Sequence, residues 1–349
     1  MRIAVCHPQT PFVRGGAEIH AEALVGALRG AGHDAELVQV PFRWYPADEL
    51  VHQMGIWRSI DVTESNSIPI DMVIALKFPA YLVKHPNKVV WLIHQHRTAY
   101  ELWDHPAFGD LAADRHGRVV RDLIHGADRV ALGEAKRIFT NSQNVAQRLE
   151  RSLGIEGVPL YHRSPMTRRL LEMEPGPVGD YVLYPSRFDR IKRQELLLEA
   201  MRSVSSGVRL VLVGAGPQEE ELRGMVRRGG LEGKVELRGG VSDDELVELY
   251  RGALGVYYGP FDEDFGYVTL EGFAAARPVV TLSDSGGPLE FVRDGENGLV
   301  ASPDAAAVAE ALERLANDRG EAERMGKAGR ETVLEMVPDW TGVVARLLG

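Results

Sequence analysis

Short apolar runs alternate with amphipathic segments along the whole chain, and this alternation predicts the secondary structure. The runs have the length of buried strands, whereas the segments between them repeat apolar residues with helical spacing. The order strand, helix, strand predicts βαβ units around parallel sheets, so the expected fold class is α/β. The predicted strands are 2–7, 35–40, 72–76, 89–94, 137–140, 181–185, 209–214, 235–238, 255–258 and 278–282, and the predicted helices include 18–29, 194–204, 219–228 and 244–251.

Two domains are expected from the chain length and from one break in the pattern. A chain of 349 residues is longer than one compact core usually spans. Residues 173–180 contain two prolines and two glycines and interrupt all periodicity, which is typical of a linker. We therefore predict an N-terminal Rossmann-like domain over residues 1–170, a linker over 171–180 and a second doubly wound domain over 181–337. Because such sheets bind ligands at the carboxyl ends of their strands, we expect a site where the two sheets face each other.

Charge and cysteine content exclude several classes of protein. The formal net charge of −10 argues against a nucleic acid as the main partner. Basic and acidic residues balance over residues 1–165, so the whole excess lies in the second half, as expected if the halves bind different ligands. The single cysteine, Cys6, allows no intrachain disulfide, and neither a signal-peptide core nor an apolar run of membrane-spanning length occurs. We expect a cytoplasmic protein, with any membrane contact being peripheral.

Two glycine-containing loops are candidates for binding phosphate. Gly15 and Gly16 follow the first predicted strand and open the first helix, where backbone N–H groups and the helix dipole favour an anion. A flexible turn explains the same residues equally well. The run Gly214-Ala215-Gly216 resembles the start of a dinucleotide fingerprint, but its third glycine is missing and three glutamates follow, so it is a weak indication of NAD.

A basic loop follows the first predicted strand of the second domain. Within residues 186–193, Arg187 and Lys192 stand at the carboxyl end of a strand in an otherwise acidic domain. Cations that converge there can neutralise a bound diphosphate. A solvated basic turn is an equally good interpretation of this loop on its own.

The most informative stretch contains two glutamates eight positions apart. If the residues between Glu263 and Glu271 are mostly helical, the two carboxylates are roughly 12 Å apart along the axis and about 80° apart in direction. They could then hold both ends of one elongated ligand, with the helix-start N–H groups of Phe265, Gly266 and Tyr267 between them. This arrangement matches a nucleotide sugar: the first carboxylate would meet the sugar, the N–H groups the diphosphate, and the second carboxylate the ribose.

With these motifs together, the sequence resembles the retaining glycosyltransferases of family 4, which have the two-domain GT-B fold. The resemblance is strong over residues 181–305 and weaker before residue 165. It implies two Rossmann-like parallel-sheet domains facing across a cleft, with the C-terminal helix of residues 338–349 crossing back onto the N-terminal domain and Trp340 as its packing anchor. The motifs that carry it are Glu263 to Glu271 as the E-x7-E signature, the glycine loop 15–18, the basic loop 187–192, and the runs 283–290 and 294–300.

The resemblance also implies a role for each site residue of the second domain. Glu263 would contact hydroxyls of the transferred sugar, and Glu271 would contact those of the ribose. Arg187 and Lys192 would bind the diphosphate. The turn Gly240-Val241, after the predicted strand 235–238, would meet the base through its backbone.

One histidine of this sequence matches the pattern of family 4, and two other residues differ from it. His94, at the end of the predicted strand 89–94, matches the family histidine that approaches the donor sugar, and His96 is its rival. Asp264 and Arg193 both stand where glycine is frequent in the family. The first bears on the turn near the sugar, and the second adds a positive charge without an assigned role.

The function that the resemblance implies is transfer of a hexose-type sugar from a nucleoside diphosphate, such as UDP or GDP, to a hydroxyl of a glycan, glycolipid or small molecule. Residues 262–264 are formally a D-x-D metal motif, but their central carboxylate is already assigned to the sugar, so we expect no metal and no cofactor besides the donor. The alternatives are a nucleotide-sugar epimerase or hydrolase of the same fold, a non-enzymatic sugar-nucleotide binding protein and, more remotely, an NAD-dependent oxidoreductase.

The stretch 115–137 is the candidate for contact with a membrane. It carries six basic and three acidic residues, with Arg115, Arg118, Arg121 and His125 near one helical face. Such a face could touch an anionic membrane or a phosphorylated lipid acceptor. A solvated helix face is the favoured alternative.

Overall fold

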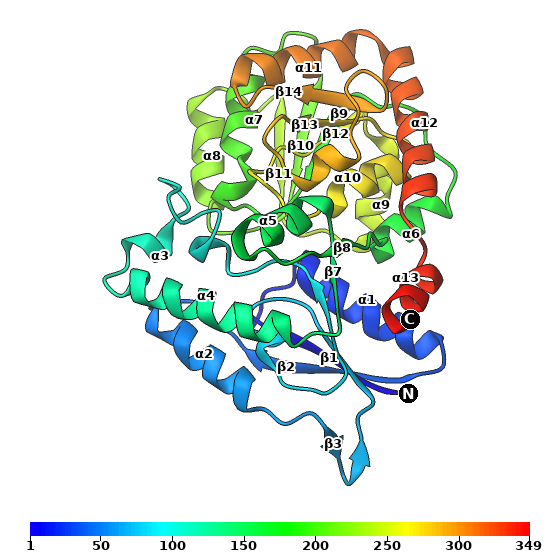
Figure 1. Cartoon of the computed structure of the whole chain (residues 1–349). Coiled ribbons are helices and arrows are strands. Elements are labelled where there is room, and N and C mark those ends of the chain that lie inside the picture. Colours follow the sequence, from blue (N-terminus) through cyan, green and yellow to red (C-terminus); the bar gives the residue numbers. More distant parts are fainter. The chain divides into compact units, whose positions relative to one another are not determined.

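The computed structural model describes all residues from 1 to 349 and contains two compact units (Figure 1). One unit consists of Met1–His162 together with Asp339–Gly349, and the other is Arg163–Pro338. Each unit has its own six-stranded sheet with helices packed against it. The expected α/β architecture of two parallel-sheet units is confirmed.

Six parallel strands form the sheet of the N-terminal unit. They are β1 (Arg2–Gln9), β2 (Asp34–Pro41), β5 (Met72–Ala75), β6 (Lys88–Leu92), β7 (Arg137–Thr140) and β8 (Val158–Pro159), and their order is β2-β1-β5-β6-β7-β8. A separate two-stranded hairpin consists of β3 (Glu64–Ser65) and β4 (Ile68–Pro69).

Helices cover both faces of this sheet. In β1, Ile3 and Val5 belong to one buried cluster, whereas Ala4 and Cys6 belong to another. Successive side chains therefore point to opposite faces of the sheet, and because both faces are buried, the strand sequence is continuously apolar. The helices are α1 (Gly16–Gly30), α2 (Asp48–Ser59), α3 (Asp110–Ala113), α4 (Gly117–Gly133), α5 (Gln143–Leu153) and α13 (Trp340–Leu348), with short 3-10 turns η1 (Ala80–Leu82) and η2 (Arg97–Ala99).

The C-terminal helix α13 belongs to the N-terminal unit and docks there through aromatic rings. The centroid of the Trp340 ring lies 6.0 Å from that of Trp91 and 5.5 Å from that of His162. The ring of His20, in α1, lies 4.1 Å from that of His162 and 4.2 Å from that of Trp91. The expectation that Trp340 anchors this helix is confirmed.

Six parallel strands also form the sheet of the C-terminal unit, in the order β11-β10-β9-β12-β13-β14. The chain runs from β9 to one edge and then returns to build the other half from β12, so the strand order reverses between β9 and β12. Crevices at such a switch point are where doubly wound sheets bind ligands. The strands are β9 (Tyr181–Pro185), β10 (Arg209–Val213), β11 (Val235–Arg238), β12 (Gly255–Tyr257), β13 (Val279–Leu282) and β14 (Gly298–Ala301).

Two groups of helices pack on this second sheet, as Figure 1 shows. Helix α7 contacts α8 and α11 in one group, whereas α10 contacts α6 and α12 in the other. The helices are α6 (Pro165–Leu171), α7 (Gln194–Met201), α8 (Glu219–Arg228), α9 (Asp243–Gly252), α10 (Tyr267–Ala274), α11 (Ala305–Asn317) and α12 (Arg319–Met336), with 3-10 turns η3 (Arg190–Lys192) and η4 (Gly287–Glu290).

The structure places the division between the units earlier than the sequence predicts. Residues 163–170, which we expected in the first domain, belong to the second unit, and helix α6 packs there on α9 and α10. The expected linker 171–180 is itself fixed to the second unit, because Arg330 donates to the carbonyls of Leu171 at 2.7 Å and Met173 at 3.2 Å, and Arg277 donates to that of Gly176 at 2.6 Å. Prolines and glycines break periodicity here, but arginines hold the segment in place.

The predicted strands are all present, with ends that differ by one or two residues. Strand β1 extends to Gln9, whereas β6 ends at Leu92, so His94 lies beyond the strand rather than in it. The edge strand β8 was missed because it is two residues long, and β14 was missed because it begins inside the run 294–300, which was interpreted as a motif rather than as a strand. Helix α7 ends at Met201, three residues before the predicted end.

Candidate functional site

Three loops meet at the switch point of the C-terminal sheet. The β9 loop is residues 186–193, the β12 loop is residues 258–266 and the β13 loop is residues 283–286. The N–H of Phe261 donates to the carbonyl of Ile191 at 2.8 Å, which joins the first two loops directly. Because all three follow parallel strands, their side chains gather at one edge of the sheet.

At the centre of these loops, Lys192 forms an ion pair with Glu263. Both side chains are 17% exposed. The hydroxyl of Tyr258 donates to Oε2 of Glu263 at 2.9 Å and accepts from Nζ of Lys192 at 3.3 Å. Burial, and then the charge of Glu263, raise the pKa of Tyr258 well above its usual value, so this hydroxyl remains a donor. An ammonium group and a carboxylate side by side can receive a phosphate and a sugar hydroxyl, respectively.

Arg187 lies on the exposed part of the β9 loop, away from this pair. Its guanidinium is 52% exposed and donates to Oδ2 of Asp189 at 3.1 Å. The structure therefore brings Lys192 and Glu263 together but does not bring Arg187 to them. The predicted diphosphate contact of Arg187 stays a prediction.

The glycines of the Gly214-Ala215-Gly216 run have a packing reason. A Cβ on Gly214, whose φ is +140°, would lie 2.1 Å from the carbonyl oxygen of Ser186, and one on Gly216 would lie 2.3 Å from that of Phe188. The run thus lets the chain after β10 pass directly against the β9 loop. This explains the two glycines without a dinucleotide.

Only part of the segment between Glu263 and Glu271 is helical. Helix α10 begins at Tyr267, and Glu263 lies before it in an isolated β-bridge with Gly286, where its N–H donates to the carbonyl of Ser285 at 2.8 Å. Gly266 is the N-cap with φ +88°, and a Cβ there would lie 2.9 Å from the Tyr258 ring. Phe265 is buried beside it. The E-x7-E pair therefore consists of one loop carboxylate and one helical carboxylate, and the helical estimate of their separation does not apply.

Glu271 is held inside the C-terminal unit by two hydroxyl groups. The Tyr250 hydroxyl donates to its Oε2 at 2.7 Å, and the Ser164 hydroxyl donates to its Oε1 at 2.8 Å. Burial raises the pKa of the Glu271 carboxyl, although these two hydrogen bonds act in the opposite direction. A carboxylate already held by hydroxyl donors is suited to accept the hydroxyls of a ribose.

The Gly240-Val241 turn is open at the end of β11. Gly240 is exposed, and no atom lies within 4 Å of the position a Cβ would take. The next residue, Ser242, is the N-cap of α9 and accepts from the N–H of Glu245 at 3.2 Å. The backbone of the turn is thus accessible, and its contact with a base stays a prediction.

In the N-terminal unit, the start of α1 carries its own carboxylate. The N–H of Gly15 donates to Oε2 of Glu18 at 2.9 Å, while Oε1 lies 3.4 Å from Nε2 of His7 and 3.7 Å from Nζ of Lys77. Burial raises the pKa of Glu18, but the hydrogen bond from His7 and the charge of Lys77 outweigh it and lower that pKa to about 2. The carboxylate of Glu18 thus accepts the hydrogen bond from the Gly15 N–H that we expected an anionic ligand to accept. Binding by Gly15 and Gly16 stays a prediction.

His94 and His96 differ in their surroundings. Nδ1 of His94 lies 2.6 Å from the carbonyl oxygen of Gln95. The His96 ring packs 5.2 Å from that of Phe78, and burial lowers the pKa of His96 to about 3. His96 is therefore neutral near pH 7, and its Nε2 lies 3.1 Å from Oγ1 of Thr98. A ligand contact by either histidine stays a prediction.

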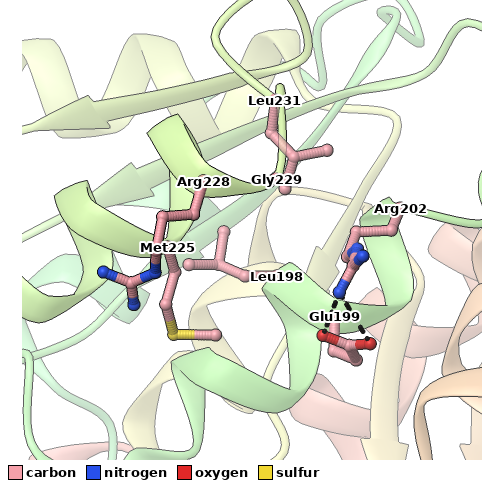
Figure 2. A pocket seen from close by; sticks show the side chains of 7 residues that line it. All are labelled: Leu198, Glu199, Arg202, Met225, Arg228, Gly229 and Leu231. Atoms are coloured by element: carbon pink, nitrogen blue, oxygen red, sulfur yellow. Dashed lines mark hydrogen bonds and ion pairs between the residues drawn. The ribbon is translucent and has the colours of Figure 1, made fainter.

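Other features of the molecule lie apart from these loops. A depression between α7 and α8 has a volume of about 180 Å³ and is lined by Leu198, Met225 and Leu231 among others, with Arg202 donating to Glu199 at 3.2 Å (Figure 2). No three His, Cys, Asp or Glu side chains are grouped as a metal site would require. No helix combines the length and the apolar character that crossing a bilayer requires.

The sequence interpretation missed the hydroxyl partners of both glutamates. Tyr258 stands in the sequence simply as the last residue of a predicted strand, and Tyr250 and Ser164 lie 21 and 107 positions from Glu271. Only the position of Tyr258, at the carboxyl end of a predicted strand beside the signature, could have indicated its place.

Comparison with known proteins shows what the C-terminal unit is similar to. Residues 177–332 match the family model described as Glycosyl transferases group 1. Phosphatidyl-myo-inositol mannosyltransferase of Mycobacterium leprae is 36% identical over 178 residues, which are 49% of this chain and 46% of that protein. The chain spans less than half the length of the curated relatives it matches.

Solved structures resemble both units. Sucrose-phosphate synthase from Thermosynechococcus elongatus aligns with a TM-score of 0.77 at 20% identity over 99% of this chain and 97% of its own. Anabaena Alr3699/HepE in complex with UDP-glucose aligns with a TM-score of 0.69 at 17% identity over 100% of this chain and 98% of its own. These similarities show the fold, which is GT-B, with two parallel-sheet units and a C-terminal helix.

Proposed function

We propose that this protein is a retaining glycosyltransferase that moves a hexose-type sugar from a nucleoside diphosphate to an acceptor hydroxyl. The contact of Lys192 with Glu263 at the switch point of the C-terminal sheet carries this proposal. It places a cation for phosphate directly beside a carboxylate for sugar hydroxyls. The match of residues 177–332 to Glycosyl transferases group 1 supports the same reaction.

Four residues of the C-terminal unit have a part in the proposed reaction. When the bond between sugar and diphosphate breaks, negative charge develops on the phosphate oxygens. The ammonium group of Lys192 stabilises that charge, aided by Arg187 once its exposed side chain turns from Asp189. Glu263 accepts from sugar hydroxyls, and Glu271 accepts from the ribose. The acceptor oxygen bonds to the anomeric carbon on the face that the diphosphate leaves, while a phosphate oxygen of the leaving group takes the acceptor proton. Bond formation on that same face gives retention of configuration.

The nature of the donor and the acceptor is proposed from the relatives. One fold neighbour, Anabaena Alr3699/HepE, was crystallised in complex with UDP-glucose. A relative in Mycobacterium tuberculosis is a GDP-mannose-dependent mannosyltransferase that acts on phosphatidylinositol monomannoside. We take UDP or GDP as the nucleotide and a glycan, glycolipid or small-molecule hydroxyl as the acceptor. A lipid-linked acceptor would bring the protein to a membrane surface.

Two alternatives of other classes use the same donor site. A nucleotide-sugar epimerase or hydrolase would turn over the donor rapidly without acceptor, and a sugar-nucleotide binding protein would bind it without turnover. Product analysis with and without a panel of acceptors separates the three. Acceptor-dependent consumption of donor favours transfer, and release of free sugar at the same rate without acceptor favours a hydrolase.

The mechanism is tested by substitution of Lys192 in the presence of EDTA. We expect Lys192→Ala to lower kcat by roughly 10²-fold or more, which is the scale for loss of one preorganised electrostatic donor. The matched control is Arg190→Ala, which removes an exposed cation from the same loop. Transfer by the wild type should proceed undiminished in excess EDTA. Activity abolished by EDTA and restored by Mn²⁺ would contradict the metal-free mechanism.

A further inference from the structure

Arg193, the last residue of the β9 loop, has an unusual backbone conformation. Its φ is +53° and its ψ is +41°, the left-handed region that residues with a Cβ disfavour. It stands between η3 and α7 and acts as the N-cap of α7. Such a conformation persists where surrounding contacts hold the residue in place.

The guanidinium of Arg193 supplies these contacts by binding two other loops. Nη1 and Nη2 donate to the two carboxylate oxygens of Asp284 at 2.8 and 2.7 Å. Nε donates to the carbonyl of Gly259 at 2.9 Å, and Nη2 also donates to that of Pro260 at 2.7 Å. A single side chain, 17% exposed, therefore ties the end of the β9 loop to the β12 and β13 loops.

The loops that Arg193 joins are those that carry the Lys192 and Glu263 pair. Lys192 is its neighbour in sequence, and Glu263 follows Gly259 in the β12 loop. The N–H of Glu263 donates to the carbonyl of Ser285, in the same β13 loop as Asp284, at 2.8 Å. Any movement of these loops apart would separate the ammonium group from the carboxylate.

We propose that Arg193 is a positioning residue that sets the separation between Lys192 and Glu263. Its planar fork binds Asp284 through two parallel hydrogen bonds and still reaches two carbonyls, which a lysine could not reproduce. The inference rests on the proposed function only in that Lys192 and Glu263 are taken as donor contacts. The clamp itself is a property of the unliganded protein.

Hydrogen exchange of the unliganded protein tests the clamp without any assumption about function. Arg193→Gly removes the guanidinium but keeps the left-handed conformation free of strain. We expect exchange in the segment 259–263 to accelerate at least tenfold, while the strand β13 stays as protected as in the wild type. Arg190→Gly is the matched control and should leave the segment unchanged. Equal exchange in Arg193→Gly and wild type would overturn the proposal.

Nucleotide binding tests the consequence for the site. Where the wild type binds UDP or GDP, Arg193→Gly should weaken that affinity at least tenfold at an unchanged melting temperature, and Arg193→Lys should recover part of the loss. Asp284→Asn should weaken it too, and the double variant should lose no more than Arg193→Gly alone. Full affinity in Arg193→Gly, or additive losses in the double variant, would overturn the proposal. If the wild type binds neither nucleotide, the proposed function fails, and the exchange result still decides the clamp.

Discussion

Glu271 is half-buried and accepts from two hydroxyl groups, and its proposed contact with the ribose is tested by nucleotide affinity. Tyr250 and Ser164 hold its two oxygens at 2.7 and 2.8 Å. A charged acceptor of hydrogen bonds is worth about 1.5 to 3 kcal/mol, so Glu271→Ala should weaken nucleoside diphosphate binding by roughly 10- to 150-fold. Isothermal titration with UDP and GDP measures this effect.

Two controls make the prediction for Glu271 specific. Tyr250→Phe removes one donor but keeps the carboxylate, so it should cost less affinity than Glu271→Ala. Glu263→Ala should mainly lower turnover, because the sugar rather than the ribose is its proposed partner. Equal nucleotide affinity for the wild type and Glu271→Ala would contradict the ribose assignment.

At the scale of single residues, the sequence identified candidate site residues better than it identified the residues that contact them. Lys192 and Glu263 were each assigned from a motif, and the structure places them in contact. Their contact with Tyr258 and the clamp by Arg193 were not predictable, because they join segments that are adjacent only after β9 and β12 pair. The partners of His94 and His96 were equally hidden, since the two histidines look alike in the sequence.

Helix α4 does not present the basic face expected from the sequence, because Arg121 and His125 bond to a backbone carbonyl of the same unit, but its exposed side is where a membrane contact can be tested. Val119, Leu123 and Val130 are 64%, 47% and 57% exposed and share one face by their spacing. Arg118 and Arg129 are exposed on the same helix, so an anionic surface would meet both apolar and cationic side chains. We expect the protein to bind vesicles of phosphatidylcholine with phosphatidylglycerol more strongly than vesicles of phosphatidylcholine alone.

Substitution within α4 tests this expectation by co-sedimentation. Leu123→Glu should reduce binding to the anionic vesicles by about tenfold, the effect of replacing an inserted apolar side chain by a repelled charge. Leu334→Glu, at a similarly exposed leucine of α12, should leave binding unchanged. Equal binding of the wild type to both kinds of vesicle would show that α4 is simply a solvated helix.

Among the elements, strands of three or more residues were mostly predictable, whereas β8 and α6 were not. The apolar runs that became β1, β9 and β10 are buried on both faces, so their composition alone marked them. Strand β8 and helix α6 have two and seven residues, too few for any period to show. Helix α6 was also placed in the wrong unit, because only its packing on α10 assigns it.

The stability of the whole fold should fall in mild acid because of buried histidines. Burial lowers the pKa of His162 to about 3 and that of His20 well below its usual value. Below about pH 6.5 these two histidines therefore bind protons in the unfolded chain but not in the folded unit. Each such histidine removes about 1.4 kcal/mol of unfolding free energy per pH unit as the pH falls from about 6.5 towards about 3.

Urea unfolding at about pH 7.5, 6.5 and 5.5 measures this dependence, since these values span the ordinary histidine pKa. His162→Phe, which keeps an aromatic ring beside His20 and Trp340, should reduce the slope by up to one proton. His52→Gln, at a histidine whose side chain is 69% exposed, is the control and should leave it unchanged. The same slope in His162→Phe as in the wild type would exclude this cause.

The central claim, that the loops around Lys192, Glu263 and Glu271 bind a nucleoside diphosphate sugar without metal, is tested most directly by thermal unfolding. The wild type, Lys192→Ala and Glu271→Ala are each melted in EDTA with UDP, GDP, ADP or dTDP. We predict that at least one nucleotide stabilises the wild type, by about 2.7 kcal/mol at about 100 times its dissociation constant, and that both variants lose most of this stabilisation. If no nucleotide raises the melting temperature, or if one raises it equally in all three proteins, the proposed donor site is contradicted.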